Sequence, residues 1–130
     1  MFTILERWRR VREALLHGWP GIALSYYRKG GEFDWNRTGR WAADVLSDLW
    51  RSRSSRSFYN VNFPMLAGND PEPEVVWCPL DPKPLPLNYR HEEESGLYYA
   101  GEYHLRHRTP EADVDVCFGG RIAITKVRLL

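Results

Sequence analysis

The chain has few of the features that would assign it to several large classes of protein. Its 130 residues include only two cysteines, Cys78 and Cys117, which lie far apart in the sequence. Two isolated thiols make neither a zinc site nor a disulfide framework, and they favour a reducing, cytoplasmic compartment. No apolar run approaches the roughly 20 residues of a membrane-spanning helix, and residues 1–10 lack the apolar segment of a signal peptide. We therefore expect a cytoplasmic protein with no membrane partner.

An excess of charge of one sign is also missing. The chain carries 18 basic and 17 acidic residues, for a net charge of +1, so no global field attracts nucleic acid or membrane. Apolar residues are plentiful, at 43%, and include six Trp, seven Tyr and five Phe. This composition and length predict one soluble domain, residues 1–130, with one modest core.

Residues 58–63 form the clearest strand signal, because they are aromatic and β-branched and Pro64 ends them. Alternation divides the strand into a face with Phe58, Asn60 and Asn62 and a face with Tyr59, Val61 and Phe63. Two asparagines on so apolar a strand need partners for their amides. They either point into a crevice at the strand end or bond to the backbone of neighbouring loops.

Upstream of this strand, the pattern predicts a helix over residues 2–17 that ends at Gly18, a buried strand over 21–26 and a helix over 35–51. Asp34 is the expected N-cap of the second helix. The expected inward residues are Ile4, Trp8, Val11 and Leu15 on the first helix and Thr38, Ala42, Val45, Leu46 and Leu49 on the second. Trp35, Trp41 and Trp50 are expected at partly exposed edges.

Strand, helix and strand over residues 12–64 make a parallel βαβ core, and the N-terminal helix should pack on one face of its sheet. Residues 65–108 differ in character, with six prolines between residues 65 and 86. Residues 75–78 are a short strand candidate that prolines restrict to a sheet edge or to an excursion. With residues 97–103 it could form a protruding antiparallel pair, joined by a long polar loop and needing another surface for stability.

Residues 109–130 read as a closing helix and strand. Thr109 is the expected N-cap, with Pro110 at the first helical position and Gly119-Gly120 as the stop. Residues 121–129 alternate as a strand does. Its expected inward residues are Ile122, Ile124 and Val127.

Several clusters contain residues that could carry chemistry, and none satisfies the requirements of the site it suggests. His91 with Glu92–Glu94 lacks ligand spacing for zinc. His104 and His107 need a third ligand.

Two further candidates also fall short. Asp113 and Asp115 lack the other oxygen ligands of a calcium loop. Ser25 lacks the glycines of a nucleophile elbow. We identify no catalytic, cofactor-binding or metal-binding residue from the residues themselves.

Two arginine-rich stretches could contact phosphate. They are Arg7, Arg9, Arg10 and Arg12 on the first helix, and Arg51, Arg53 and Arg56 in the serine-rich connector. A solvated helix face and an ordinary exposed turn are the more common explanations of such stretches. Weak nucleic-acid binding is therefore one alternative function.

Four segments, taken in order, resemble the C-terminal half of the SurE survival-protein family of 5′/3′-nucleotidases, which are acid phosphatases. They are residues 12–25 with Gly-Trp-Pro-Gly-Ile-Ala-Leu-Ser, residues 60–64 with Asn-Val-Asn-Phe-Pro, residues 96–101 with Gly-Leu-Tyr-Tyr-Ala-Gly, and residues 109–125 with Thr-Pro-Glu-Ala-Asp and Gly-Arg-Ile-Ala-Ile-Thr. The resemblance runs from Arg12 to the end of the chain. It implies a partial SurE-like three-layer α/β sandwich with a protruding β-hairpin.

The resemblance also implies phosphomonoester hydrolysis with a divalent metal such as magnesium or manganese. The family holds that metal with an Asp-Asp pair, a Ser and an Asn, all upstream of what this chain contains, and its Ser-Gly-Thr helix start is not matched at residues 5–11. We therefore expect the chain to be inactive alone, as a truncated product or one half of a split enzyme. A nucleoside monophosphate would bind only after completion by an N-terminal half.

The alternative is a non-enzymatic oligomerisation or scaffolding module. Its partner would be a second copy or a full-length relative, bound through residues 75–103.

Overall fold

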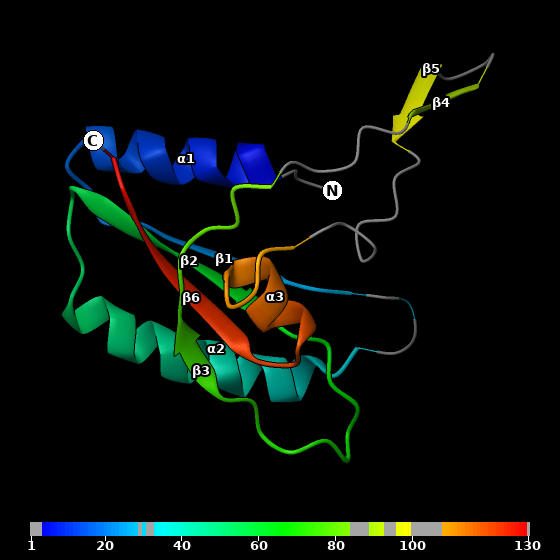
Figure 1. Cartoon of the computed structure of the whole chain (residues 1–130). Coiled ribbons are helices and arrows are strands. Elements are labelled where there is room, and N and C mark those ends of the chain that lie inside the picture. The colour runs from blue at the N-terminus through cyan, green and yellow to red at the C-terminus, as the bar shows by residue number, and fades with distance from the viewer. Residues whose placement is uncertain are drawn as a thin grey trace.

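A four-stranded mixed sheet carries the fold, in the computed structural model that describes residues 4–28, 30, 33–83, 89–92, 96–99 and 108–129. Its strands are β1 (Ile22–Tyr26), β2 (Ser57–Phe63), β3 (Val75–Trp77) and β6 (Ile122–Arg128). They lie in the order β1-β2-β6-β3. Helix α2 (Trp35–Arg51) covers one face, while α1 (Ile4–Leu16) and the short α3 (Asp113–Phe118) lie on the other (Figure 1). The predicted three-layer α/β class is thus confirmed.

The βαβ core forms as the sequence predicts. Strands β1 and β2 pair in parallel, from Ile22 beside Tyr59 to Tyr26 beside Phe63, with α2 between them in the chain. Helix α2 begins where expected, because the Asp34 side chain accepts a hydrogen bond from the backbone N–H of Arg37 at 2.9 Å. This cap satisfies one of the amides that a helix start leaves unpaired.

Helix α1 ends at a glycine in the left-handed conformation, which confirms Gly18 as its terminating residue. Gly18 has φ of 79°. Its N–H donates to the carbonyl of Leu15 at 2.9 Å, and the N–H of Trp19 donates to that of Ala14 at 3.0 Å. This pair of bonds is the Schellman motif, which closes a helix and turns the chain sharply. The turn directs the chain into β1.

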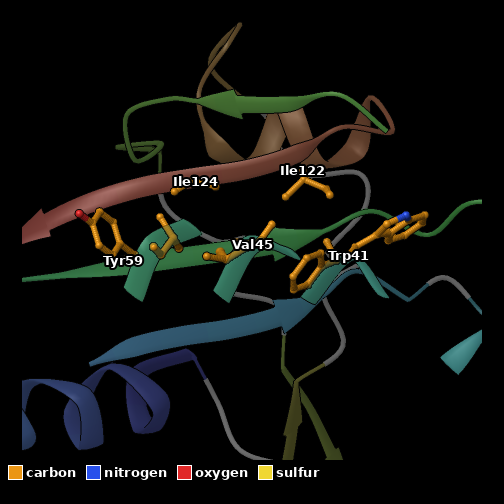
Figure 2. Packing of buried hydrophobic residues seen from close by; sticks show 8 residues of the cluster. Trp41, Val45, Tyr59, Ile122 and Ile124 are labelled. Atoms are coloured by element: carbon orange, nitrogen blue, oxygen red, sulfur yellow. The ribbon is translucent and has the colours of Figure 1, made fainter. Parts of the chain in front are cut away.

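The main core lies between α2 and the sheet (Figure 2), where Val45 and Trp41 of α2 meet Tyr59, Ile122 and Ile124. Trp41 is 7% exposed, so its predicted place at a partly exposed edge is wrong. The buried stripe of α2 runs through Arg37, Trp41, Val45 and Leu49. Val45 and Leu49 of the predicted stripe are confirmed, and Ala42 packs partly buried against the core, whereas Leu46 is exposed. The stripe also includes Arg37 and Trp41, which the sequence pattern did not predict.

The opposite face of β2 packs against α1, as its alternation predicts. Leu15, Ala23 and Phe58 are buried together, with Trp8 and Val11 packed against them. The Trp8 and Phe58 rings meet edge to face at 5.6 Å between centroids, a favoured geometry for aromatic pairs. This cluster confirms three of the four predicted inward positions of α1; the side chain of Ile4 lies outside the description.

The strand at residues 75–78 does not form an antiparallel pair with residues 97–103, so that prediction is wrong. Instead β3 pairs in parallel with β6 as an edge strand of the main sheet. The N–H of Cys78 donates to the carbonyl of Ile124 at 3.0 Å, and that of Ile122 to the carbonyl of Glu74 at 2.9 Å. The prolines flank β3 without interrupting it, which leaves its N–H groups available to β6.

A two-stranded sheet does lie apart from the main one, with a different partner pair. Strand β4 (Tyr89–Glu92) pairs antiparallel with β5 (Gly96–Tyr99). Figure 1 shows this hairpin projecting away from the layers. Residues 89–92 were expected in a polar loop, and that expectation is wrong; residues 100–103 lie outside the described residues.

The closing helix starts later than predicted. Helix α3 begins after Ala112, which makes no side-chain cap. Glu111 has φ of 62°, a left-handed conformation that no α-helical residue adopts. Thr109 caps nothing in α3; its N–H and hydroxyl both donate to the Asp81 carboxylate, at 2.8 and 3.0 Å.

The predicted closing strand does form as β6. Residues 122–125 are all buried, because β6 is covered on both faces.

Candidate polar site at the carboxyl ends of β1 and β2

Two polar side chains meet at the edge of the sheet where the parallel strands β1 and β2 end. Ser25 and Asn62 are the next-to-last residues of their strands and lie directly beside each other in the register. The Ser25 hydroxyl donates a hydrogen bond to the amide oxygen of Asn62. Both side chains are half-buried. Ligands of open α/β sheets bind at this edge, so the pair is a candidate site for a polar ligand.

Asn60 lies two residues deeper on the same face of β2. It is 7% exposed, and its amide oxygen accepts a hydrogen bond from the indole N–H of Trp8 at 3.1 Å. Of the two alternatives, bonding to loop backbone is wrong for both amide oxygens. They accept hydrogen bonds from side chains of α1 and β1, which lie over and beside this face.

The chemistry open to this pair is limited to hydrogen bonding. The Ser25 hydroxyl donates its hydrogen bond to an amide oxygen, which is too weak a base to activate a hydroxyl for nucleophilic attack. A hydroxyl and a carboxamide can orient a phosphate or a sugar hydroxyl at a strand end. The site could therefore position a polar ligand, but it supplies no general acid or base.

The acids near α3 serve the local backbone and an ion pair. Asp113 accepts from the N–H of Asp81 at 2.7 Å. Asp115 accepts from the N–H of Glu111 at 3.0 Å and pairs with Arg108 at 3.0 Å. The two carboxylates thus have separate partners, and the structure does not bring them together as ligands of one cation.

Across the residues that the structure describes, no three His, Cys, Asp or Glu side chains are grouped so as to hold a metal ion. The candidates at residues 93–94, His104 and His107 lie outside those residues, as do the side chains of His91 and Glu92.

The arginine-rich stretches lie at the surface in separate places. On α1, Arg9 and Arg10 line an open groove of about 670 Å³ in which Glu6 and Glu13 are interleaved with them. In the connector, Arg53 lies over the exposed ring of Trp50, 4.5 Å from its centroid, and donates to the Trp50 carbonyl at 2.8 Å. The mixed charge of the groove makes it a poor phosphate site.

The two thiols are not activated as nucleophiles. Burial raises the pKa of Cys117 to about 12. Burial also raises the pKa of Cys78. A reactive cysteine has a lowered pKa and an exposed sulfur, so neither thiol fits that role.

Arg37 is a buried charged residue that the sequence pattern did not predict. Arg37 is 5% exposed and binds the loop after β2 through its guanidinium. Its acceptors are the carbonyl oxygens of Ala67 (2.6 Å), Asp70 (2.6 Å) and Pro71 (3.1 Å), and the Glu72 carboxylate (3.3 Å). The only sequence feature that indicates its burial is its spacing, since it lies four residues before Trp41 on the buried stripe of α2. Arg37 holds the loop that leads to β3, so its role is to stabilise the fold.

The elements are arranged as in an open-sheet α/β protein, and a solved structure shares this fold. The structure titled as the SurE protein of Aquifex aeolicus aligns with 96% of this chain and 52% of its own length, with a TM-score of 0.66. Sequence identity in that alignment is 16%, so this likeness concerns the fold alone.

Sequence comparison carries the assignment further. The model of the family described as "Survival protein SurE" matches residues 10–83. A protein of Nostoc sp., provisionally named as a 5′-nucleotidase, is 49% identical over 121 residues, and one of the same name in Synechocystis sp. is 41% identical. The chain belongs to the SurE family. Each alignment covers 92% of this chain and 53% of the relative, so the chain spans about half the length of these relatives.

None of the described helices is long and apolar enough to span a bilayer.

Proposed function

We propose that this chain is the C-terminal half of a metal-dependent phosphomonoesterase that acts on nucleoside monophosphates. The observation that carries the proposal is the 49% identity, over 92% of the chain, to a protein provisionally named as a 5′-nucleotidase. The polar pair Ser25 and Asn62 supports it, because it lies at the sheet edge where such a substrate would be held.

The described residues do not themselves fit the divalent metal that this chemistry uses. Magnesium and manganese are bound mainly by carboxylates and water, whereas the strand-end site offers a hydroxyl and two carboxamides. When bound, such a metal polarises the phosphate and activates water. We therefore propose that its ligands come from a second half of the fold and that this chain alone does not hydrolyse phosphomonoesters.

Phosphate release from adenosine monophosphate tests the proposal. We expect none from the purified chain with magnesium or manganese, and release when the chain is combined with the half of the Nostoc relative that it does not match. A Ser25→Ala, Asn62→Ala double variant should raise KM in the combined enzyme. Turnover by the chain alone that persists through repurification and is lost when the metal is removed would show that it has a complete site of its own.

A second candidate function is self-association through the β4–β5 hairpin. A two-stranded ribbon is marginally stable on its own, and this one is separate from the main sheet. The sequence analysis expected an association surface over residues 75–103. Because β3 belongs to the main sheet, the proposed surface is limited to the β4–β5 hairpin. Replacing residues 89–99 by a short Gly-Ser linker should convert an oligomer into a monomer in sedimentation. A monomeric parent chain would rule this function out.

A further inference from the structure

Three chain segments meet at the side of the molecule opposite to the polar pair Ser25 and Asn62. Figure 1 shows the carboxyl end of α2, the start of β2 and the end of β6 at this side, on the left of the view. Five basic residues lie on these ends and on the connector between α2 and β2, and all are exposed: Arg51, Arg53, Arg56, Lys126 and Arg128. We call these five residues the basic patch.

Hydrogen bonds hold the end of β6 and the connector side by side. The N–H of Leu129 donates to the carbonyl of Arg56 at 3.0 Å. Lys126 is paired with Tyr59 in the β2–β6 register, and the Tyr59 hydroxyl donates to the carbonyl of Ser52 at 3.0 Å. Residues that are about 70 positions apart in the sequence are thereby brought to one surface.

The positive charge of the basic patch is not balanced locally. Residues 49–69 and 116–130 contain no Asp or Glu, and Asp48 is the nearest acid along the chain. None of the five cations forms an ion pair with another described residue. The net charge of the whole chain is only +1, so the patch is a local concentration of charge that attracts an anionic partner.

An exposed tryptophan adjoins the basic patch. Trp50 is 52% exposed, although the Arg53 guanidinium lies over its ring at 4.5 Å from the centroid. Arg53 is held in this position by its hydrogen bond to the Trp50 carbonyl at 2.8 Å. Indole rings and guanidinium planes are groups on which unpaired bases stack, and the other cations can contact phosphates. This combination fits a single strand better than a duplex, in which the faces of the bases are covered by their neighbours.

We propose that the basic patch and Trp50 bind single-stranded nucleic acid, with phosphates held by the cations and a base stacked on Trp50. The contact is independent of base sequence, because stacking and charge are open to every base. The arginines of α1, which alternate with Glu6 and Glu13, take no part. The inference does not depend on the proposed function, since the patch and the polar pair lie at opposite ends of β2.

Fluorescence anisotropy of a labelled oligothymidylate of about 15 nucleotides, titrated with the full 130-residue chain, tests the proposal. We expect binding at low salt that weakens as the salt concentration rises. Trp50→Ala should weaken it about tenfold, which is the order expected for one stacked base. Arg53→Gln should weaken it too and should lower the slope of log affinity against log salt by about 0.7, the value for one phosphate contact on a single strand.

The matched controls are Trp35→Ala and Arg40→Gln. Trp35 is 65% exposed and lies at the other end of the same helix. Arg40 is an exposed arginine of that helix, and its replacement removes the same charge as Arg53→Gln. Both controls should leave the affinity and the salt slope nearly unchanged. Thermal unfolding of each variant checks that the fold is retained.

Three results would overturn the inference. The first is the absence of salt-sensitive binding, and the second is an equal effect of Trp50→Ala and Trp35→Ala. The third is equal competition by polyglutamate and by unlabelled oligothymidylate, which would indicate an acidic polypeptide as the partner. A duplex of the same length should bind more weakly than the single strand, and tighter binding of the duplex would contradict the stacking contact.

Discussion

Buried polar side chains hold the layers of this protein together through few and specific hydrogen bonds. Asn60 is linked to α1 by Trp8, and Arg37 links α2 to the loop after β2. A buried acceptor that loses its donor retains the full cost of its desolvation. Single substitutions at these positions should therefore have effects well above those of surface residues.

Replacing Trp8 by Phe tests the link between α1 and β2. The substitution keeps a ring against Phe58 and removes the indole N–H, so the Asn60 oxygen loses its donor. We expect the free energy of unfolding to fall by about 1–3 kcal/mol, measured by urea denaturation. Trp19→Phe is the control, because Trp19 is exposed and its replacement should change stability by less than about 0.5 kcal/mol. Equal effects would mean that the hydrogen bond contributes nothing.

Acidification tests the contacts of Glu72. The Trp41 indole donates to its carboxylate at 2.6 Å, and this bond, together with nearby Arg37, lowers the pKa of Glu72 below its ordinary value. A lowered pKa in the folded state stabilises the fold above the ordinary carboxyl pKa, and that stabilisation is lost as the pH falls through the lowered value. Glu72→Gln should therefore lower the unfolding midpoint at neutral pH, with the difference shrinking as the pH falls below the ordinary pKa of a glutamate.

The control for this titration is Asp48→Asn on the exposed side of α2, which changes the net charge equally. A difference between Glu72→Gln and the parent chain that does not depend on pH would contradict the assignment.

At the scale of the elements, two glycines illustrate how position decides the effect of one residue type. Gly18 closes α1 at positive φ, whereas Gly39 lies inside α2 and an added Cβ there would meet nothing within 4 Å. Gly18→Ala should cost about 1 kcal/mol because an L-residue is strained in the left-handed region. Gly39→Ala should stabilise by about 1 kcal/mol because alanine favours a helix interior. Opposite shifts of the thermal midpoint are expected, and shifts of one sign would refute this.

At the scale of the whole molecule, the clusters on the two faces share strands β2 and β6. Tyr59 and Val61 of β2 belong to the core under α2, and Phe58 of the same strand belongs to the cluster under α1. Neither layer can open without disturbing the common strand. We expect one cooperative urea transition, with tryptophan fluorescence and far-ultraviolet circular dichroism coinciding. Two separated transitions would show that the layers unfold independently.

Local patterns in the sequence determined the elements whose signals are complete within a few residues. Asp34 starts α2, Gly18 ends α1, and Pro64 ends β2, because a cap, a left-handed turn and a missing N–H act through the backbone nearby. The alternation of β2 likewise established which side chains face which layer, and the ordered motifs indicated the family. These features need no knowledge of distant residues.

Only the tertiary structure decided which strand β3 joins, where Trp41 and Arg37 lie, and what Asn60 and Asn62 bond to. Each depends on residues far away in the chain: β3 on β6, Arg37 on the loop at residues 67–72, and Asn60 on Trp8. Thr109 is of a residue type that commonly caps helices, yet it binds Asp81, 28 residues away. Competition for hydrogen-bond partners and buried volume is settled across the whole fold, and for that reason no local pattern predicts its outcome.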